Sequence, residues 1–240
     1  MTNILVISDL HFEKGSFRGI YQDGALDWLL KIVDKTKATA LVGLGDWGSA
    51  WTLVDWNLLT QKVTTHAIFG NHDNVDLLES VKNIDDSKVL AHDGEIRNIE
   101  GIKFGFINGV MSDKGTPRRN VPRSTSEDFL RIASTNFKRL DILCTHESPI
   151  VPEYGKKFNS GMGPAAMTKV IEKVQPKISI SGHLDFGPYT VSKIGQTITV
   201  RIESGQMNRH YAIIKPDKNE VEVWYDENFK EKLPVSLKPV

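Results

Sequence analysis

Short apolar runs, each followed by a polar residue and then by a helical stretch, recur along the chain. Residues 3–7 form an apolar run typical of a buried strand, and residues 23–35 carry apolar side chains at the spacing of an amphipathic helix. The same pattern predicts further strands at residues 40–44, 67–69, 141–145 and 177–181, and further helices at residues 52–61, 75–81 and 164–174. Strands that alternate with helices in this way indicate an α/β fold.

The middle of the chain has a different pattern. Two alternating segments, residues 95–99 and 102–107, lie on either side of Glu100-Gly101 and predict a hairpin. Residues 111–123 show no clear period and predict a loop. Ser124 and Glu127 then have the spacing of a capping box, which would open a helix that ends near Phe137.

The last part of the chain predicts only strands, at residues 190–193, 197–203, 211–215 and 220–225. No internal repeat or linker-like stretch separates the segments of the chain. We therefore expect residues 1–240 to form a single domain in which two packed sheets are covered by helices.

Chemically active residues collect at the ends of five predicted strands. The segments that follow these strands are Asp9-Leu10-His11, Gly45-Asp46, Gly70-Asn71-His72-Asp73, His146 and Gly182-His183-Leu184-Asp185. They contain four of the seven histidines of the chain. Because ligands bind at the carboxyl ends of strands in open α/β sheets, we expect these side chains to meet in one crevice. Carboxylates, imidazoles and an amide together suit first-row divalent metal ions.

Each of these residues also has an ordinary structural explanation. An aspartate such as Asp9 or Asp73 caps the next helix in many proteins, and a lone histidine such as His146 is more often a hydrogen-bonded core or loop residue. The repetition of such residues at the same end of every one of these strands favours a shared site over five separate structural roles.

The five segments, in this order, closely resemble the signature of the calcineurin-like metallophosphoesterases, which reads D-x-H, G-D, G-N-H-[DE], H and G-H-x-H. The resemblance extends from residue 9 to residue 185. It implies a two-sheet β-sandwich flanked by helices, in four αββα layers. It also implies a hydrolase that acts on phosphoric ester bonds and carries two metal ions.

The resemblance further implies which residues hold the metal ions. One ion would be bound by Asp9, His11, Asp46 and the last residue of the fifth segment, and the other by Asp46, Asn71, His146 and His183. A hydroxide bridging the two ions would attack the phosphorus. His72 would protonate the leaving oxygen or stabilise charge on the phosphoryl group. Asp73 would orient the His72 ring, cap the helix that begins near Val75, or do both.

The chain departs from the family signature at Asp185, where the family has histidine. A third carboxylate would make the cluster one unit more negative. We therefore expect manganese, iron or magnesium to be preferred over zinc. Alternatively Asp185 is not a ligand, and His210 approaches the metal ion from the last sheet.

Composition narrows the function. Lysine plus arginine equals aspartate plus glutamate at 30 each, so the basic excess of extended nucleic-acid binders is missing. The single cysteine, Cys144, excludes an intrachain disulfide and fits a reducing compartment. The first apolar run is too short for a signal peptide or a membrane span, so we expect a cytoplasmic protein without a membrane partner.

Several features are candidates for contacting the substrate. Residues 116–123 hold three arginines, which bind phosphates well, although a solvated surface loop explains them equally. Residues 155–163 lead into a helix start at Pro164, which is either an anion site or a plain helix terminus. Trp47 and Trp51 would stack on a ring or, more commonly, pack in the core.

These observations leave three functions from different classes. The first is a phosphoesterase that cleaves a small phosphomonoester or phosphodiester. The second is a metal-dependent nuclease similar to the family's double-strand-break repair members, which the zero net charge disfavours. The third is a scaffold on the same fold without catalysis, which the nearly complete signature disfavours. Cys144 has no accompanying base or oxyanion motif, so we expect a small buried side chain rather than a nucleophile.

Overall fold

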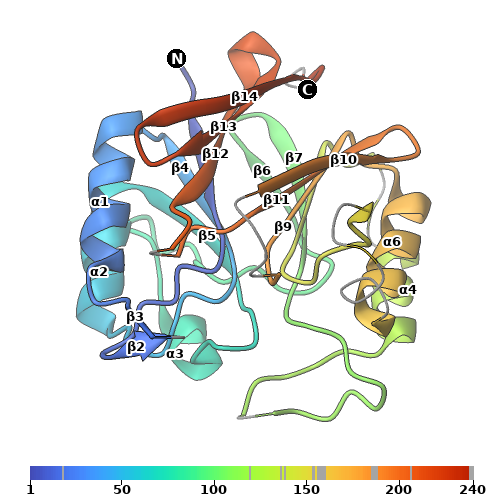
Figure 1. The fold of residues 1–240 in the computed structure, drawn as a ribbon, viewed down its shortest axis with the longest axis horizontal. Helices are drawn as coiled ribbons and strands as arrows, with labels where there is room; N and C mark the ends of the chain where they lie inside the picture. The colour runs from blue at the N-terminus through green and yellow to red at the C-terminus, as the bar shows by residue number, and fades with distance from the viewer. Residues whose placement is uncertain are drawn as a thin grey trace.

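Two six-stranded sheets stacked face to face form the centre of the molecule (Figure 1). The computed structural model describes residues 1–17, 19–118, 120–135, 137, 139–152, 155, 161–184, 189–205 and 207–237. The first sheet has the order β14 (Asn228–Pro234), β13 (Glu220–Tyr225), β12 (His210–Lys215), β1 (Ile4–Ile7), β4 (Ala40–Leu44), β5 (Thr64–Ile68). The second has the order β10 (Tyr189–Ile194), β11 (Thr197–Ile202), β9 (Ile178–Ser181), β8 (Ile142–Thr145), β7 (Ile102–Ile107), β6 (Ile96–Ile99).

Helices cover the outer faces of both sheets. The described helices are α1 (Ala25–Thr36), α2 (Leu53–Lys62), α3 (Val75–Ser80), α4 (Ser126–Thr135), α6 (Met162–Val174) and the short 3-10 helix η2 (Pro216–Lys218). A small hairpin, β2 (Ser16–Phe17) with β3 (Ile20–Tyr21), stands apart from the sheets. Figure 1 shows α1 and α2 on one side of the stacked sheets and α4 and α6 on the other. None of the described helices is long and apolar enough to cross a membrane.

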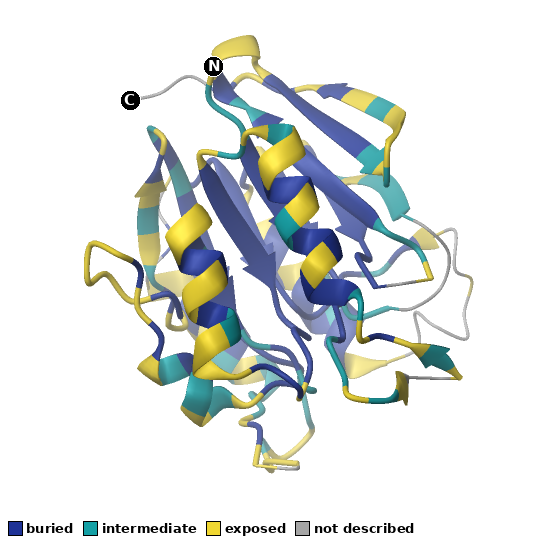
Figure 2. Cartoon of the chain, turned by 90° about the vertical axis from the view of Figure 1, so that its left-hand side faces the viewer, coloured by how far each residue is buried: buried dark blue, intermediate teal, exposed yellow. Residues whose placement is uncertain are grey.

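The alternation of side chains along the strands explains the layers. On β1, Ile4 and Val6 pack between the two sheets, whereas Leu5 and Ile7 pack with the apolar faces of α1 and α2. Figure 2 shows α1 and α2 with buried residues toward the sheet and exposed residues toward solvent. A third apolar cluster lies between the second sheet and helices α4 and α6. The predicted four-layer αββα sandwich is therefore confirmed.

Parallel pairing brings the carboxyl ends of the central strands to the same edge of each sheet. Strands β1, β4 and β5 are mutually parallel in the first sheet, and β7, β8 and β9 are mutually parallel in the second. In the second sheet β11 also pairs in parallel with β9, and antiparallel strands form the outer parts of both sheets. The residues that follow the triplets thus lie where open α/β sheets place their ligands.

Most predicted elements are present, with two informative differences at helix starts. The predicted hairpin turn is confirmed, and Glu100 and Gly101 have φ angles of 53° and 82°, as a two-residue turn of this kind requires. The predicted capping box is wrong by one residue, because Thr125 and Asp128 exchange the reciprocal hydrogen bonds at the start of α4. Helix α6 begins at Met162, two residues before the predicted Pro164.

Three strands were not predicted. Strands β2 and β3 have only two residues each, which is too short for a period. Strand β14 is an exposed edge strand rich in lysine and glutamate, a composition that protects an open sheet edge but hides the strand from a search for apolar alternation. Strand β5 begins three residues earlier than predicted, because its first residues are polar.

Candidate metal centre

The residues after the central strands turn sharply out of the sheets. Four of them have φ in the left-handed region, which side chains other than glycine rarely adopt: Asp9 at 54°, His11 at 49°, Asp46 at 53° and His183 at 69°. Backbone bonds hold the first turns in place, with the amide of Asp9 donating to the carbonyl of Gly45 and the amide of His11 to that of Asp46. Strained conformations of this kind gather at functional sites, where the surrounding structure enforces them.

Two groups of possible metal ligands meet at this place and share one residue. Asp9, His11 and Asp46 form the first group, and Asp46, His146 and His183 form the second. In each group the ligand atoms lie within 4.8 Å of one another. In the first group, His11 Nε2 lies 3.7 Å from Asp46 Oδ2 and 4.0 Å from Asp9 Oδ1.

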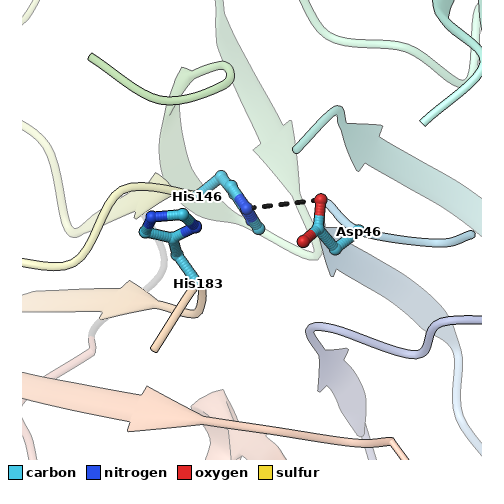
Figure 3. A group of neighbouring side chains, drawn as sticks. All are labelled: Asp46, His146 and His183. Atoms are coloured by element: carbon cyan, nitrogen blue, oxygen red, sulfur yellow. Dashed lines mark ion pairs between the residues drawn. The ribbon is translucent and has the colours of Figure 1, made fainter. Parts of the chain in front are cut away.

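The second group joins the two sheets. Asp46 follows β4 of the first sheet, whereas His146 and His183 follow β8 and β9 of the second, and the three side chains face one another (Figure 3). His146 Nδ1 lies 2.8 Å from the carbonyl oxygen of Leu44. Because a carbonyl only accepts hydrogen bonds, Nδ1 carries the proton and Nε2, 3.4 Å from Asp46 Oδ1, is left as a ligand atom.

The residues present fit a pair of divalent ions. Asn71, on the loop after β5, has a buried side-chain oxygen that finds no hydrogen-bond partner among the described residues. A buried amide oxygen left without a donor is costly, and a cation is the partner that it lacks. Carboxylate, imidazole and amide donors together form a ligand set suited to borderline or hard divalent ions.

Asp9 is oriented by a set of hydrogen bonds around its carboxylate. The Ser8 hydroxyl donates to Oδ2 over 2.6 Å, and the backbone amide of His183 donates to Oδ1 over 3.1 Å and to Oδ2 over 2.9 Å. Ser204, on the loop before β12, accepts a bond from the amide of Ser8 and donates its own amide to the Ser8 carbonyl. The loop between β11 and β12 therefore supports Asp9 through Ser8.

Asp73 holds the backbone of two strand ends rather than the start of a helix. Its carboxylate accepts hydrogen bonds from the amides of Asp46 at 2.9 Å, Gly48 at 3.1 Å and Gly70 at 2.7 Å. The predicted capping role is wrong, because Asn74 caps α3 by accepting from the amide of Leu77. That Asp73 also orients the ring of His72 stays a prediction.

Close packing at the centre depends on glycine. A Cβ on Gly70 would overlap Asp46 Oδ1 and the ring of His146, and a Cβ on Gly182 would overlap Ser8 and Asp9 Oδ2. Any larger residue at either position would push the facing carboxylate out of place.

Burial and mutual charge shift the pKa values of the centre. Burial raises the pKa of Asp9 and of Asp73 to about 7, and the charge of nearby Asp46 adds to both shifts. Burial also opposes ionisation of Asp46 and His146, but their attraction outweighs it. As a result, the pKa of His146 rises to about 10 and that of Asp46 falls well below its usual range. Divalent cations bound at this cluster would therefore displace protons from His146 and from the buried carboxyl groups.

A model of the calcineurin-like phosphoesterase family matches residues 2–184 of the chain. The chain belongs to this family. Since the match spans most of the chain, the resemblance of the five segments to the family signature is confirmed. A search of curated proteins gives no match.

Solved structures support the calcineurin-like phosphoesterase fold. TT1561 of Thermus thermophilus is 14% identical with a TM-score of 0.63, and the alignment covers 94% of this chain and 99% of that one. GAP50, described as the anchor in the inner membrane complex of Plasmodium, is 11% identical with a TM-score of 0.57, over 99% of this chain and 89% of that one. A 5'-nucleotidase precursor, also from Thermus thermophilus, is 10% identical with a TM-score of 0.51, over 97% of this chain and 53% of that one. At such identities the likeness concerns the fold.

Not every residue predicted for the phosphoesterase centre can be placed. Asp185, the departure from the family signature, lies outside the described residues. His210 begins β12 and lies outside both ligand groups found among the described residues. Its ring packs between those of Tyr189 and Tyr225, with centroids 5.5 Å and 4.9 Å away.

Of the features considered for substrate contact, the two tryptophans belong to the core, whereas Asn120 and Val121 of the arginine-rich loop line the cleft described below. Trp47 and Trp51 are buried and pack against each other and against Trp56, so the core-packing alternative is correct for both. Cys144 is fully buried between the sheets, where burial raises the pKa of its thiol, and it is a core residue as expected. Of residues 155–163, all but 155 and 161–163 lie outside the described residues, and in the arginine-rich loop Arg119 does too.

A cleft of about 860 Å³ opens beside the candidate metal centre. It begins at Asn71 and His72, on the loop after β5, and extends along the segment that leads into hairpin β2–β3. Its lining includes Glu13, Lys14, Ser49 and Asp76. No motif pointed to Glu13 and Ser49, since they are ordinary polar residues in loops, and only their contact across the fold singles them out.

Proposed function

We propose that the protein is a metal-dependent phosphoesterase that hydrolyses a small phosphomonoester or phosphodiester. The observation that carries the proposal is the position of Asp46, which belongs to both ligand groups. A carboxylate shared in this way suits two ions held side by side, as in dinuclear phosphoesterases. Membership of the calcineurin-like phosphoesterase family supports the same reaction class.

In this proposal Asp9, His11 and Asp46 hold one divalent ion, with Asp185 as a fourth ligand. Asp46, Asn71, His146 and His183 hold the other. The ions would supply the positive charge that stabilises the phosphate oxygens and makes a water molecule a better nucleophile. Because the ligand set is rich in carboxylates, we propose that manganese, iron or magnesium is preferred over zinc.

His72 is the proposed proton donor to the leaving oxygen. It lies at the start of the cleft, and its ring packs edge-on against that of His11 with centroids 5.3 Å apart. Its backbone amide donates to Asp46 Oδ1 over 2.8 Å, which ties the loop that carries it to the shared carboxylate. A side chain held beside the centre and facing the cleft can reach the oxygen of the alcohol that departs.

The proposed partner is a small phosphate ester rather than extended nucleic acid. Equal numbers of basic and acidic residues give the chain no general attraction for a polyanion. A nuclease of the double-strand-break repair type is the second candidate, and a scaffold without catalysis is the third.

The proposal is tested by removing metal, restoring manganese, and measuring hydrolysis of bis-nitrophenyl phosphate and of nitrophenyl phosphate. Asn71→Ala should lose both activity and part of the bound manganese, whereas His72→Ala should lose activity and keep its manganese. His92→Ala is a matched control, because this histidine is 62% exposed and lies outside both ligand groups found among the described residues.

Manganese-dependent cleavage that disappears in both site variants would support the dinuclear mechanism. The preferred ester would then decide between a diesterase and a monoesterase. If no metal restores cleavage of either ester, the phosphoesterase proposal fails and the scaffold becomes the better interpretation.

A further inference from the structure

The residues that line the cleft beside the metal centre can recognise the part of the substrate other than its phosphate group. Its lining includes Asn71 and His72, where the proposed reaction takes place. At about 860 Å³ it is much larger than a phosphate group, so it has room for the organic part of a substrate. Because the proposed proton donor lines the cleft, the part of the substrate that fills it is the alcohol of the ester.

Glu13 is held in one orientation on the wall of this cleft. Its Oε1 accepts a hydrogen bond from the amide of Ser49 over 3.0 Å, and its Oε2 accepts one from the Ser49 hydroxyl. The two residues come from different loops, after β1 and after β4, so the fold itself sets their contact. A carboxylate oxygen has more than one acceptor position, and Glu13 therefore keeps acceptor capacity for a ligand.

The rest of the lining is polar and carries more negative than positive charge. Glu13, Asp73 and Asp76 bring three carboxylates, of which that of Asp73 accepts from backbone amides, and Lys14 brings one ammonium group. Phe, Tyr and Trp do not occur among the described residues that line the cleft, and the aliphatic side chains among these residues are those of Val75 and Val121. The cleft thus offers hydrogen-bond acceptors to donor groups on a substrate. Its described lining lacks the flat aromatic surface on which a base stacks and the apolar wall that an alkyl chain needs.

We infer that the substrate is the phosphate ester of a small alcohol bearing hydroxyl or ammonium groups, and that Glu13 is a specificity-determining residue for that alcohol. The inference rests on the proposed function, because the phosphate must be held at the metal centre for the alcohol to lie beside Glu13. It adds the substrate class, which the family membership leaves open.

The test measures binding to manganese-loaded His72→Asn protein by titration calorimetry, since this variant keeps the proposed ligands and should consume the probes slowly. The probes are inorganic phosphate and the phosphate monoesters of glycerol, ethanolamine, choline and propanol. All share the phosphate group, so differences in affinity among the esters measure how the cleft binds their alcohol groups. Glycerol phosphate and ethanolamine phosphate should bind about tenfold more tightly than propyl phosphate.

Further substitutions in the His72→Asn protein test whether Glu13 causes the preference for the polar esters over propyl phosphate. Glu13→Gln should reduce the preference for ethanolamine phosphate to about twofold and leave binding of inorganic phosphate unchanged. Ser49→Ala should lower the affinity for ethanolamine phosphate by about threefold, because Glu13 loses the hydroxyl that anchors Oε2 and keeps only the backbone amide. Glu227→Gln, whose side chain is 56% exposed and outside the cleft, should bind all probes like the parent.

The possible outcomes separate the two proposals. Equal affinity for the four esters, or choline phosphate binding as tightly as ethanolamine phosphate, would overturn the inference while the phosphoesterase proposal stands. A preference that Glu13→Gln leaves intact would overturn the role of Glu13. Binding of none of the probes, inorganic phosphate included, would overturn both the inference and the proposed function.

Discussion

The two sheets contribute different chemistry to the same centre. The first sheet supplies the described carboxylates and the amide, Asp9, Asp46 and Asn71, together with the imidazole of His11. The second sheet supplies two imidazoles, those of His146 and His183. Neither sheet alone holds the second ligand group, so the centre exists only when the sheets are stacked. Among the described residues the carboxylates of the centre thus come from the first sheet, and Asp46 belongs to both ligand groups.

Loss of the residue common to both groups should have the largest effect. We expect Asp46→Asn to abolish binding of both metal ions and to lower kcat/KM by about ten-thousandfold, which corresponds to roughly 5.5 kcal/mol. Metal analysis after dialysis against manganese would measure the stoichiometry. Asp9→Asn and His183→Asn each affect one group, so either variant should retain about half of the bound metal. Retention of both ions in Asp46→Asn would show that the two groups are not bridged.

Core substitutions can test whether the centre depends on the contact between the sheets. Phe106 is fully buried between the sheets, and Phe129 is fully buried between the second sheet and α4. Replacing either by alanine should lower the free energy of unfolding by about 3 to 4 kcal/mol, as judged by urea denaturation. Only Phe106→Ala should also weaken manganese binding under conditions where both variants are folded. Equal metal affinity in the two variants would contradict the dependence of the centre on sheet stacking.

The two sheets also meet through a histidine and an arginine at their edges. Arg97 on β6 lies 3.1 Å from His66 Nδ1 on β5, and Nδ1 accepts the hydrogen bond because an arginine only donates. Burial and the charge of Arg97 lower the pKa of His66 to about 4.

The lowered pKa of His66 makes the stability of the folded protein depend on pH. The folded state keeps His66 neutral, whereas the unfolded chain binds a proton near pH 6.5, so stability should fall as the pH drops from about 6.5 toward 4. We expect His66 to contribute roughly 1 to 2 kcal/mol to that loss. Urea unfolding of the parent and of His66→Gln across this range would measure it. A parent and variant with the same pH dependence would exclude the contribution of His66.

The smallest expected effect concerns the start of α4, a helix that covers the second sheet. Thr125→Ala should lower the free energy of unfolding by about 1 kcal/mol, because the side chain accepts from the amide of Asp128 and donates to its carboxylate. Ser124→Ala is the matched control, one residue earlier, and should change stability by much less. A larger loss of stability in Ser124→Ala than in Thr125→Ala would show that Ser124 is the capping residue, as its spacing from Glu127 indicates.

Some parts of this fold could be predicted from local pattern and others could not. The strand at β4 and the hairpin of β6 and β7 were predicted closely, because an apolar run and a two-residue turn are both local signals. Strand β14 was missed because it packs little of its surface, and the cap of α4 was misplaced because two adjacent residues both had capping chemistry. The order of the strands in each sheet also needed the structure, since nothing along the chain states which strands are neighbours.

The sequence by itself determined the kinds of ligand and their place at the ends of strands. Strand periodicity and the identity of the next residues are local properties, so Asp9, Asp46 and His146 could be recognised without a fold. Tertiary structure alone decided that two ligand groups share Asp46, that Leu44 selects the tautomer of His146, and that Glu13 meets Ser49 across the cleft. These relations depend on how two sheets stack and twist against each other, and therefore on contacts between residues far apart in the chain.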